Sequence, residues 1–234
     1  MQYQLNIAID SNGLNAIYQA GLAVTLVKSV VASPLVQGNL PIAWVEFQPF
    51  QNNLVSWIEN YHAYATTTTV QSGATIFMTS QTSTPVQTGW TYSFAQGQFS
   101  AAQGGAVGVY TVHNNTPGST FSFGLAQQAS INNVTTFAPL NAQPVPFNMD
   151  ATFTPQEIIS IFLSSYVNNG VVISQVASNA LTVTLTSQHP TASIGYNDQQ
   201  NSFYLIGQSL VTPHEHALCL SAGGSIQRAL LLGA

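Results

Sequence analysis

The chain has 234 residues, of which 45% are hydrophobic and only 4% are charged. An average globular domain carries about 25% charged residues, so Gln, Asn, Ser and Thr must keep this surface in water. Lys28 and Arg228 are the only lysine and arginine, and seven acids bring the formal net charge to −5. Nucleic acids and anionic lipid surfaces are bound through clusters of Lys and Arg. Both classes of partner are therefore excluded.

The length suits one domain, because all-β sandwiches often exceed 200 residues without dividing. No linker composition interrupts the chain, and we expect residues 1–234 to form a single domain. The N-terminus shows no basic and apolar signal peptide, which predicts a cytoplasmic rather than a secreted protein. No run of about 18 apolar residues predicts a transmembrane segment.

Alternation of apolar and polar residues is the dominant pattern, and it is typical of half-buried antiparallel strands. It begins with Tyr3, Leu5, Ile7 and Ile9. Similar runs follow at residues 90–95, 121–125, 147–153, 181–185 and 203–206, separated by turn sequences such as Ser11-Asn12-Gly13. Residues 23–31 and 42–47 are apolar on both faces, which indicates central strands or a subunit contact. The sequence predicts an all-β, mainly antiparallel β-sandwich of about 10–14 strands with one or two short helices.

Two segments fit both helix and strand. Thr154-Pro155-Gln156-Glu157 has the pattern of a capping box with proline at the first helical position, which predicts a helix ending near Asn168. The alternative is a hairpin that pairs residues 161–167 with residues 171–176 through an Asn-Asn-Gly turn. Residues 53–64 are equally ambiguous, because their large apolar side chains match helical spacing and also a strand face.

A pair of histidines in Pro213-His214-Glu215-His216 is the most pointed local feature. On a strand, His214 and His216 would project from one face, and two imidazoles so placed can share a divalent metal ion with a third ligand. We take Asp198 as the third ligand, with His189 and Asp150 as alternatives. The competing interpretation is a polar strand with two surface histidines.

A second candidate site is the aromatic segment from Trp57 to Tyr64. Trp57, Tyr61 and Tyr64 could form a stacking floor for a flat ligand or a sugar, with two polar residues as hydrogen-bonding groups. These polar residues are Glu59 and His62. The competing interpretation is packing in the core, where buried Trp and Tyr also find hydrogen-bond partners.

These features favour a non-catalytic protein that binds a small, uncharged, aromatic molecule, pigment-like or metabolite-like, with a divalent metal ion as a candidate cofactor. A lectin that binds a neutral glycan is the first alternative, and a membrane-active or self-assembling structural protein is the second. An enzyme is less favoured, since no Ser, Cys or Thr stands in a recognisable nucleophile motif. A surface with so few charges offers little repulsion between sheet edges, so we also expect a homo-oligomer.

Overall fold

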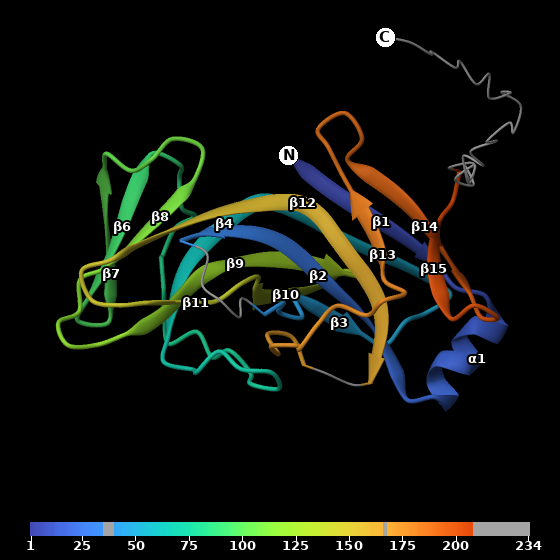
Figure 1. Ribbon diagram of the computed structural model, residues 1–234. Helices are drawn as coiled ribbons and strands as arrows, with labels where there is room; N and C mark the ends of the chain where they lie inside the picture. The colour runs from blue at the N-terminus through green and yellow to red at the C-terminus, as the bar shows by residue number, and fades with distance from the viewer. Residues whose placement is uncertain (35–39, 166–167, 208–234) are drawn as a thin grey trace, which may run out of the picture.

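The computed structural model describes residues 1–34, 40–165 and 168–207, and in this part of the chain fifteen strands form two sheets (Figure 1). Sheet A contains β1 (Gln2–Ala8), β4 (Asn52–Thr66), β5 (Ser80–Gln81), β9 (Phe121–Ile131), β10 (Val134–Pro139), β11 (Gln143–Val145), β14 (Thr191–Asn197) and β15 (Ser202–Leu205). Sheet B contains β2 (Leu22–Ser33), β3 (Val45–Phe47), β6 (Trp90–Ala95), β7 (Gln98–Gln103), β8 (Tyr110–Asn114), β12 (Asp150–Ser165) and β13 (Leu181–Thr184).

The sheets have open strand orders. Sheet A runs β10-β9-β4-β1-β14-β15, with β11 beside β9 and β5 beside β4. Sheet B runs β3-β2-β12-β8-β6-β7, with β13 beside β12. Only β1 with β14 and β6 with β8 pair in parallel; every other strand pair described is antiparallel. The expectation of a mainly antiparallel β-sandwich is confirmed.

The inward faces of the two sheets form the main hydrophobic core. Alternate residues of β1, namely Tyr3, Leu5 and Ile7, are buried there as the sequence predicts. The same core contains large side chains of sheet B such as Phe94 and Phe153, both at most 1% exposed. Burial of apolar surface of this kind is the main favourable term in folding.

The helix expected over residues 155–168 is absent; residues 150–165 form the long strand β12 instead. This prediction was wrong because the capping signal is local, whereas β12 pairs with β2 along eleven residue positions. The β-branched residues Ile158, Ile159 and Ile161 suit a strand between two neighbours. Pro155, which cannot donate to the ladder, lies at a break in the pairing, where a missing N–H is tolerated.

The alternative hairpin between residues 161–167 and 171–176 is not formed by its described residues, 161–165 and 171–176, either. Val171 and Val172 make isolated bridges to Thr75 and Ile42, and β12 pairs with β2 in that region. The ambiguous segment at residues 53–64, by contrast, is resolved as a strand within β4.

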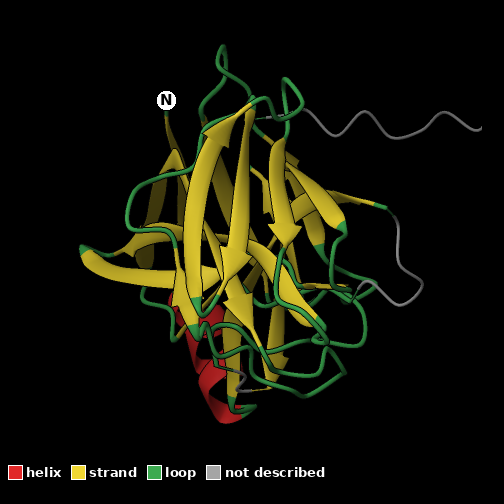
Figure 2. Cartoon of the chain, turned by 90° about the vertical axis from the view of Figure 1, so that its left-hand side faces the viewer, coloured by secondary structure: helices red, strands yellow, loops and turns green. Residues whose placement is uncertain are grey.

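The described residues contain one helix, α1 (Ser11–Gln19), which lies at one end of the strands (Figure 2). The sequence predicted a turn at Ser11-Asn12-Gly13, and this prediction was wrong. Asp10 caps the helix, because its carboxylate accepts a hydrogen bond from Gly13 N at 2.7 Å. Gly13 fits closely here, since a Cβ at this position would lie 2.8 Å from the Tyr196 ring.

Two further strand predictions need correction at their ends. Residues 42–47 contribute only the short edge strand β3, although Ile42 and Trp44 are fully buried. The alternation expected from residue 147 starts at residue 150, and Phe147 and Met149 are exposed. In both places an apolar pattern indicates burial or extension but does not define the strand boundary.

Each sheet contains a bulge. Between Trp57 and Tyr61 three residues of β4 lie opposite one residue of β9, and between Pro155 and Ile159 three residues of β12 lie opposite one residue of β2. Bulges redirect side chains and interrupt pairing. Glu157 of the β12 bulge accepts hydrogen bonds from Trp57 and Tyr61, which flank the β4 bulge, so the two bulges meet in the interior of the sandwich.

Candidate functional site

The structure divides the predicted aromatic site between the two faces of sheet A. Trp57 and Tyr61 point into the main core and are each 3% exposed. Tyr64 is buried in a smaller cluster with Ile42 and Ile76, apart from the main core. Glu59, in the bulge, accepts a hydrogen bond from the Tyr3 hydroxyl at 2.8 Å. These residues therefore do not form one continuous stacking floor.

His62 belongs to a pocket of about 420 Å³ beside the β4 bulge. The pocket extends from β1 across β4 to β9 and β10, on the side of sheet A opposite the main core. Its size is within the range of small-molecule sites. Its lining consists of Gln2, Ser56, Trp57, Ile58, Asn60, His62, Gln81, Pro85, Gln128, Ala129, Ser130 and Phe137.

Among the described residues that line the pocket there is no Asp, Glu, Lys or Arg. The Phe137 ring meets the His62 ring edge to face, with centroids 5.5 Å apart. His62 is also fixed by a 2.8 Å contact between Nδ1 and the Thr82 carbonyl oxygen. The walls therefore combine apolar surface with amide and hydroxyl groups, which suits an uncharged ligand that forms neutral hydrogen bonds.

Several pocket residues were missed by the sequence prediction. Gln128 and Ser130 lie on β9 and Phe137 lies on β10, far from Trp57 in sequence. The only sequence signal they give is their position on the polar face of alternating strands. The register of β9 on β4, which pairs Ser130 with Ser56, brings them to the site.

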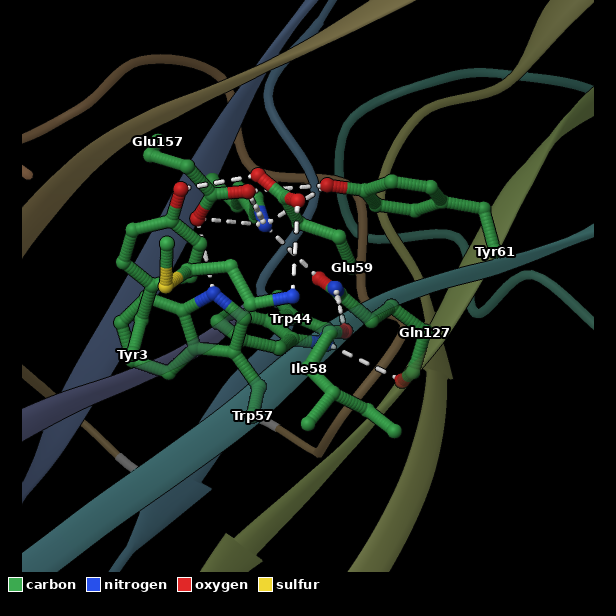
Figure 3. A network of polar contacts seen from close by, with 10 residues as sticks. Tyr3, Trp44, Trp57, Ile58, Glu59, Tyr61, Gln127 and Glu157 are labelled. Carbon is green, nitrogen blue, oxygen red and sulfur yellow. Dashed lines mark hydrogen bonds and ion pairs between the residues drawn. The ribbon is translucent and has the colours of Figure 1, made fainter. Parts of the chain in front are cut away.

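A buried lysine, Lys28, lies where the two bulges meet. Figure 3 shows the polar network at this place, with Glu157, Gln127 and Tyr61 among its labelled members. The Lys28 side chain is 0% exposed, and its ammonium donates to Glu157 Oε1 at 2.7 Å and Oε2 at 2.9 Å. It also donates to Gln127 Oε1 at 2.9 Å and to the Tyr61 hydroxyl at 3.2 Å. A buried charge needs such partners, because removal from water is expensive.

Three aromatic rings surround the same ammonium group. The Lys28 Nζ atom lies 5.6 Å from the Trp44 ring centroid, 5.4 Å from that of Trp57 and 5.2 Å from that of Tyr61, all within cation–π range. Burial lowers the pKa of Lys28 to about 8, although the neighbouring Glu157 carboxylate opposes the shift.

Glu157 is held by further donors. The Trp57 indole Nε1 donates to Oε2 at 2.7 Å, and the Tyr61 hydroxyl donates to Oε1 at 2.9 Å. Together with the Lys28 ammonium, these donors provide hydrogen-bond partners for both carboxylate oxygens. Glu157 lies in the β12 bulge. It is the residue that completes the capping-box pattern from which a helix was predicted; in the structure its carboxylate instead accepts hydrogen bonds in the interior of the sandwich.

The network also reaches the pocket wall. The Gln127 side-chain amide accepts from Lys28, and its Nε2 donates to the Ile58 backbone carbonyl at 2.6 Å. Ile58 lies in the β4 bulge and lines the pocket, where its side chain is 47% exposed. The interior network therefore holds one wall of the pocket in place from behind.

Buried tyrosines predict how the protein responds to alkali. Burial, with the neighbouring Glu59, raises the pKa of Tyr3 to about 12, and burial raises the pKa of Tyr61 and Tyr64 as well. The folded pKa of each exceeds its unfolded value near 10, so their contribution to stability is complete below pH 10 and falls as pH rises further. A titration followed by tyrosinate absorbance should show a class of tyrosines that ionises only on unfolding. Coincident ionisation of all nine in native and urea-unfolded protein would contradict this.

The predicted metal ligands are only partly within the described residues. Asp198 lies between β14 and β15, whereas His214 and His216 lie outside the described residues. Of the alternative metal ligands, Asp150 has its Oδ1 atom 2.7 Å from the Nδ1 atom of His113. Across residues 1–34, 40–165 and 168–207, no three His, Cys, Asp or Glu side chains are grouped as metal ligands would be. The His214–His216 site stays a prediction.

No family model matches this sequence, no curated protein is detectably similar to it, and no solved structure matches its fold. In the described part of the chain, no helix is both long and apolar enough to cross a bilayer.

Proposed function

We propose that the protein binds a small uncharged molecule, without catalysis, in the pocket that His62 and Phe137 help to line. The observation that supports this most strongly is the uncharged lining of the pocket, where amide and hydroxyl groups stand beside apolar surface. A charged ligand would lose its hydration without gaining an ionic partner there. A neutral ligand would replace its bonds to water by bonds to Asn, Gln and Ser.

The leading ligand class is a flat, aromatic, pigment-like or metabolite-like molecule. The Phe137 and His62 rings already pack edge to face at 5.5 Å, and the exposed Ile58 and Pro85 add apolar surface. Aromatic groups favour such offset and edge contacts. A volume of about 420 Å³ has room for one or two fused rings with polar substituents.

A neutral sugar is the second candidate. Six amide or hydroxyl side chains line the pocket, and amides and hydroxyls are the groups that hydrogen-bond sugar hydroxyls. They are Gln2, Ser56, Asn60, Gln81, Gln128 and Ser130.

Ligand-detected NMR can separate the two candidates. One panel would contain neutral indoles, phenols and flavonoid-type compounds, and the other neutral mono- and disaccharides. We expect saturation transfer to members of one panel, lost in the Phe137→Ala variant. Failure of both panels to show transfer, or transfer that Phe137→Ala leaves unchanged, would overturn the proposal.

Self-association is a further proposal. The described sheets have open edges at β15 and β7, and Tyr204 of β15 is 45% exposed beside an exposed Ile206. An edge strand without opposing charges can pair with another copy. Light scattering after size-exclusion chromatography should give a discrete multiple of the 24.9 kDa monomer mass. A monomer at 100 µM, roughly the range in which weak edge contacts would be populated, would contradict the prediction.

A further inference from the structure

The Lys28 centre places an amine, a primary amide and a carboxylate together inside the sandwich. Lys28 belongs to β2 and Glu157 to β12, both in sheet B, whereas Gln127 belongs to β9 in sheet A. We propose that Lys28 and Gln127 join in an intramolecular amide bond that links the two sheets covalently, with Glu157 as the proton acceptor and donor. This modification does not require a bound ligand, but the release of Gln127 Nε2 would remove its hydrogen bond to the carbonyl of Ile58, which lines the pocket.

Proximity is the first argument. Lys28 Nζ lies 2.9 Å from Gln127 Oε1. The Gln127 Cδ atom is one C=O bond further, about 1.23 Å, so the amine is within about 4.1 Å of the carbon that it would attack. Both side chains belong to residues that are at most 2% exposed, and strands on both sheets fix their backbones. A small rotation about the side-chain bonds converts this hydrogen-bonded contact into an attacking one.

The surroundings supply a nucleophile. An ammonium group is inert, but removal from water favours the neutral amine and lowers the pKa of Lys28 to about 8, against the opposing effect of the Glu157 carboxylate. Glu157 Oε1, at 2.7 Å, is the nearest acceptor for the proton that leaves. The same aromatic rings keep water from competing as the nucleophile.

The reaction balances without a further reagent. Lys28 gives one proton to Glu157, and the lone pair of Nζ then attacks Gln127 Cδ to form a C–N bond. The C–Nε2 bond breaks as the protonated Glu157 gives its proton to the departing nitrogen. The attacking Nζ, which still carries one proton too many for an amide, loses that proton through Glu157 to the same departing nitrogen. One ammonium ion is released in total: the ammonium of Lys28 and the amide of Gln127 become a secondary amide and NH₄⁺, and Glu157 is again a carboxylate.

Gln127 is a better acyl donor than Glu157, although both contact Lys28. The Glu157 oxygens accept hydrogen bonds from the Trp57 indole and the Tyr61 hydroxyl, and a carboxylate resists attack by an amine. Gln127 is neutral at the carbon that reacts. Its Nε2, the leaving nitrogen, is drawn away from Lys28 by its 2.6 Å bond to the Ile58 carbonyl.

Intact-mass spectrometry of the denatured full chain tests the proposal. We expect a mass lower than that of the sequence by one ammonia molecule. An unchanged mass would overturn the proposal, and loss of one water molecule would also overturn it, because that result would indicate a Lys28–Glu157 link. This measurement needs only the native sequence and does not depend on the folding of any variant.

Trypsin gives an independent readout, because Lys28 and Arg228 are the only Lys and Arg residues in the chain. If Lys28 is linked, trypsin should not cut after it in urea, and residues 1–228 should remain one fragment. Release of a free 1–28 peptide would contradict the link. Glu157→Gln and Lys28→Met should abolish the mass loss. The matched control Glu59→Gln should retain it, because Glu59 bonds Tyr3 rather than Lys28.

Discussion

The Glu157→Leu variant is expected to have a free energy of unfolding about 3–5 kcal/mol lower than that of the double variant Lys28→Met, Glu157→Leu, because its buried Lys28 ammonium lacks the carboxylate with which it pairs in the described part of the chain. Lys28 could escape by releasing its proton. Relative to an ordinary pKa of 10.5, that release costs about 1.4 kcal/mol for each pH unit, or about 5 kcal/mol at pH 7. Urea unfolding followed by tryptophan fluorescence would measure the loss.

The double variant Lys28→Met, Glu157→Leu is the control for this prediction. Neither the single nor the double variant can form the proposed amide, so the comparison between them reports the unpaired charge alone. We expect the double variant to recover most of the lost stability. An equally unstable double variant would show that packing rather than charge is responsible.

The single variant Glu157→Leu should also depend on pH in a defined direction. Without the carboxylate, the folded pKa of Lys28 lies further below its unfolded value, so the folded state binds fewer protons. Stability then rises as pH increases from 7 to 9, by at most about 1.4 kcal/mol per pH unit. Stability that falls over this range would contradict the assignment of Lys28 as the buried, unpaired cation.

Removal of the Phe137 ring is expected to have the largest effect on binding. Loss of one aromatic contact is worth about 1–2 kcal/mol, so Phe137→Ala should weaken binding of the ligand found by NMR by about 5–30-fold. Titration calorimetry would give both affinities. Ser130→Asp should lower the affinity for the same ligand more than tenfold, or by more than about 1.4 kcal/mol, because it places a carboxylate in a pocket lined by uncharged side chains.

Phe77→Ala is the matched control, since Phe77 is 69% exposed and does not line the pocket. It should leave the affinity unchanged. Unfolding midpoints of all three variants should be compared, because Phe137 also packs partly against the small cluster around Tyr64. Equal loss of affinity in Phe77→Ala and Phe137→Ala would place the ligand elsewhere.

The β-sandwich architecture could be predicted from the sequence because the alternation of apolar and polar residues is visible within each strand. The apolar residues of that pattern are the ones that the core buries. Tyr3, Leu5 and Ile7 alternate in the sequence and point inward in the structure. The error at residues 155–168 has a physical cause. Thr154-Pro155-Gln156-Glu157 is a valid capping pattern by itself, but the partners that overrule it lie more than 100 residues away on β2.

The candidate site was harder to predict for a related reason. The aromatic segment from Trp57 to Tyr64 lies on β4, but its side chains do not share one face of the sheet. The bulge and the alternation of the strand place some of them in the main core and others on the opposite face of sheet A. The Lys28 centre combines residues separated by 99 and 129 positions. Only the scarcity of lysine marked it in the sequence: a chain with two basic residues has buried one of them completely.

Backbone NMR of the protein with its selected ligand tests most directly whether the uncharged pocket is the binding site. The account predicts that perturbed amide signals cluster at residues 56–62 of β4, at residues 128–130 of β9 and at Phe137, with the same affinity in low and high salt. Perturbations confined to the opposite sheet, or an affinity that collapses when salt is added, would contradict it.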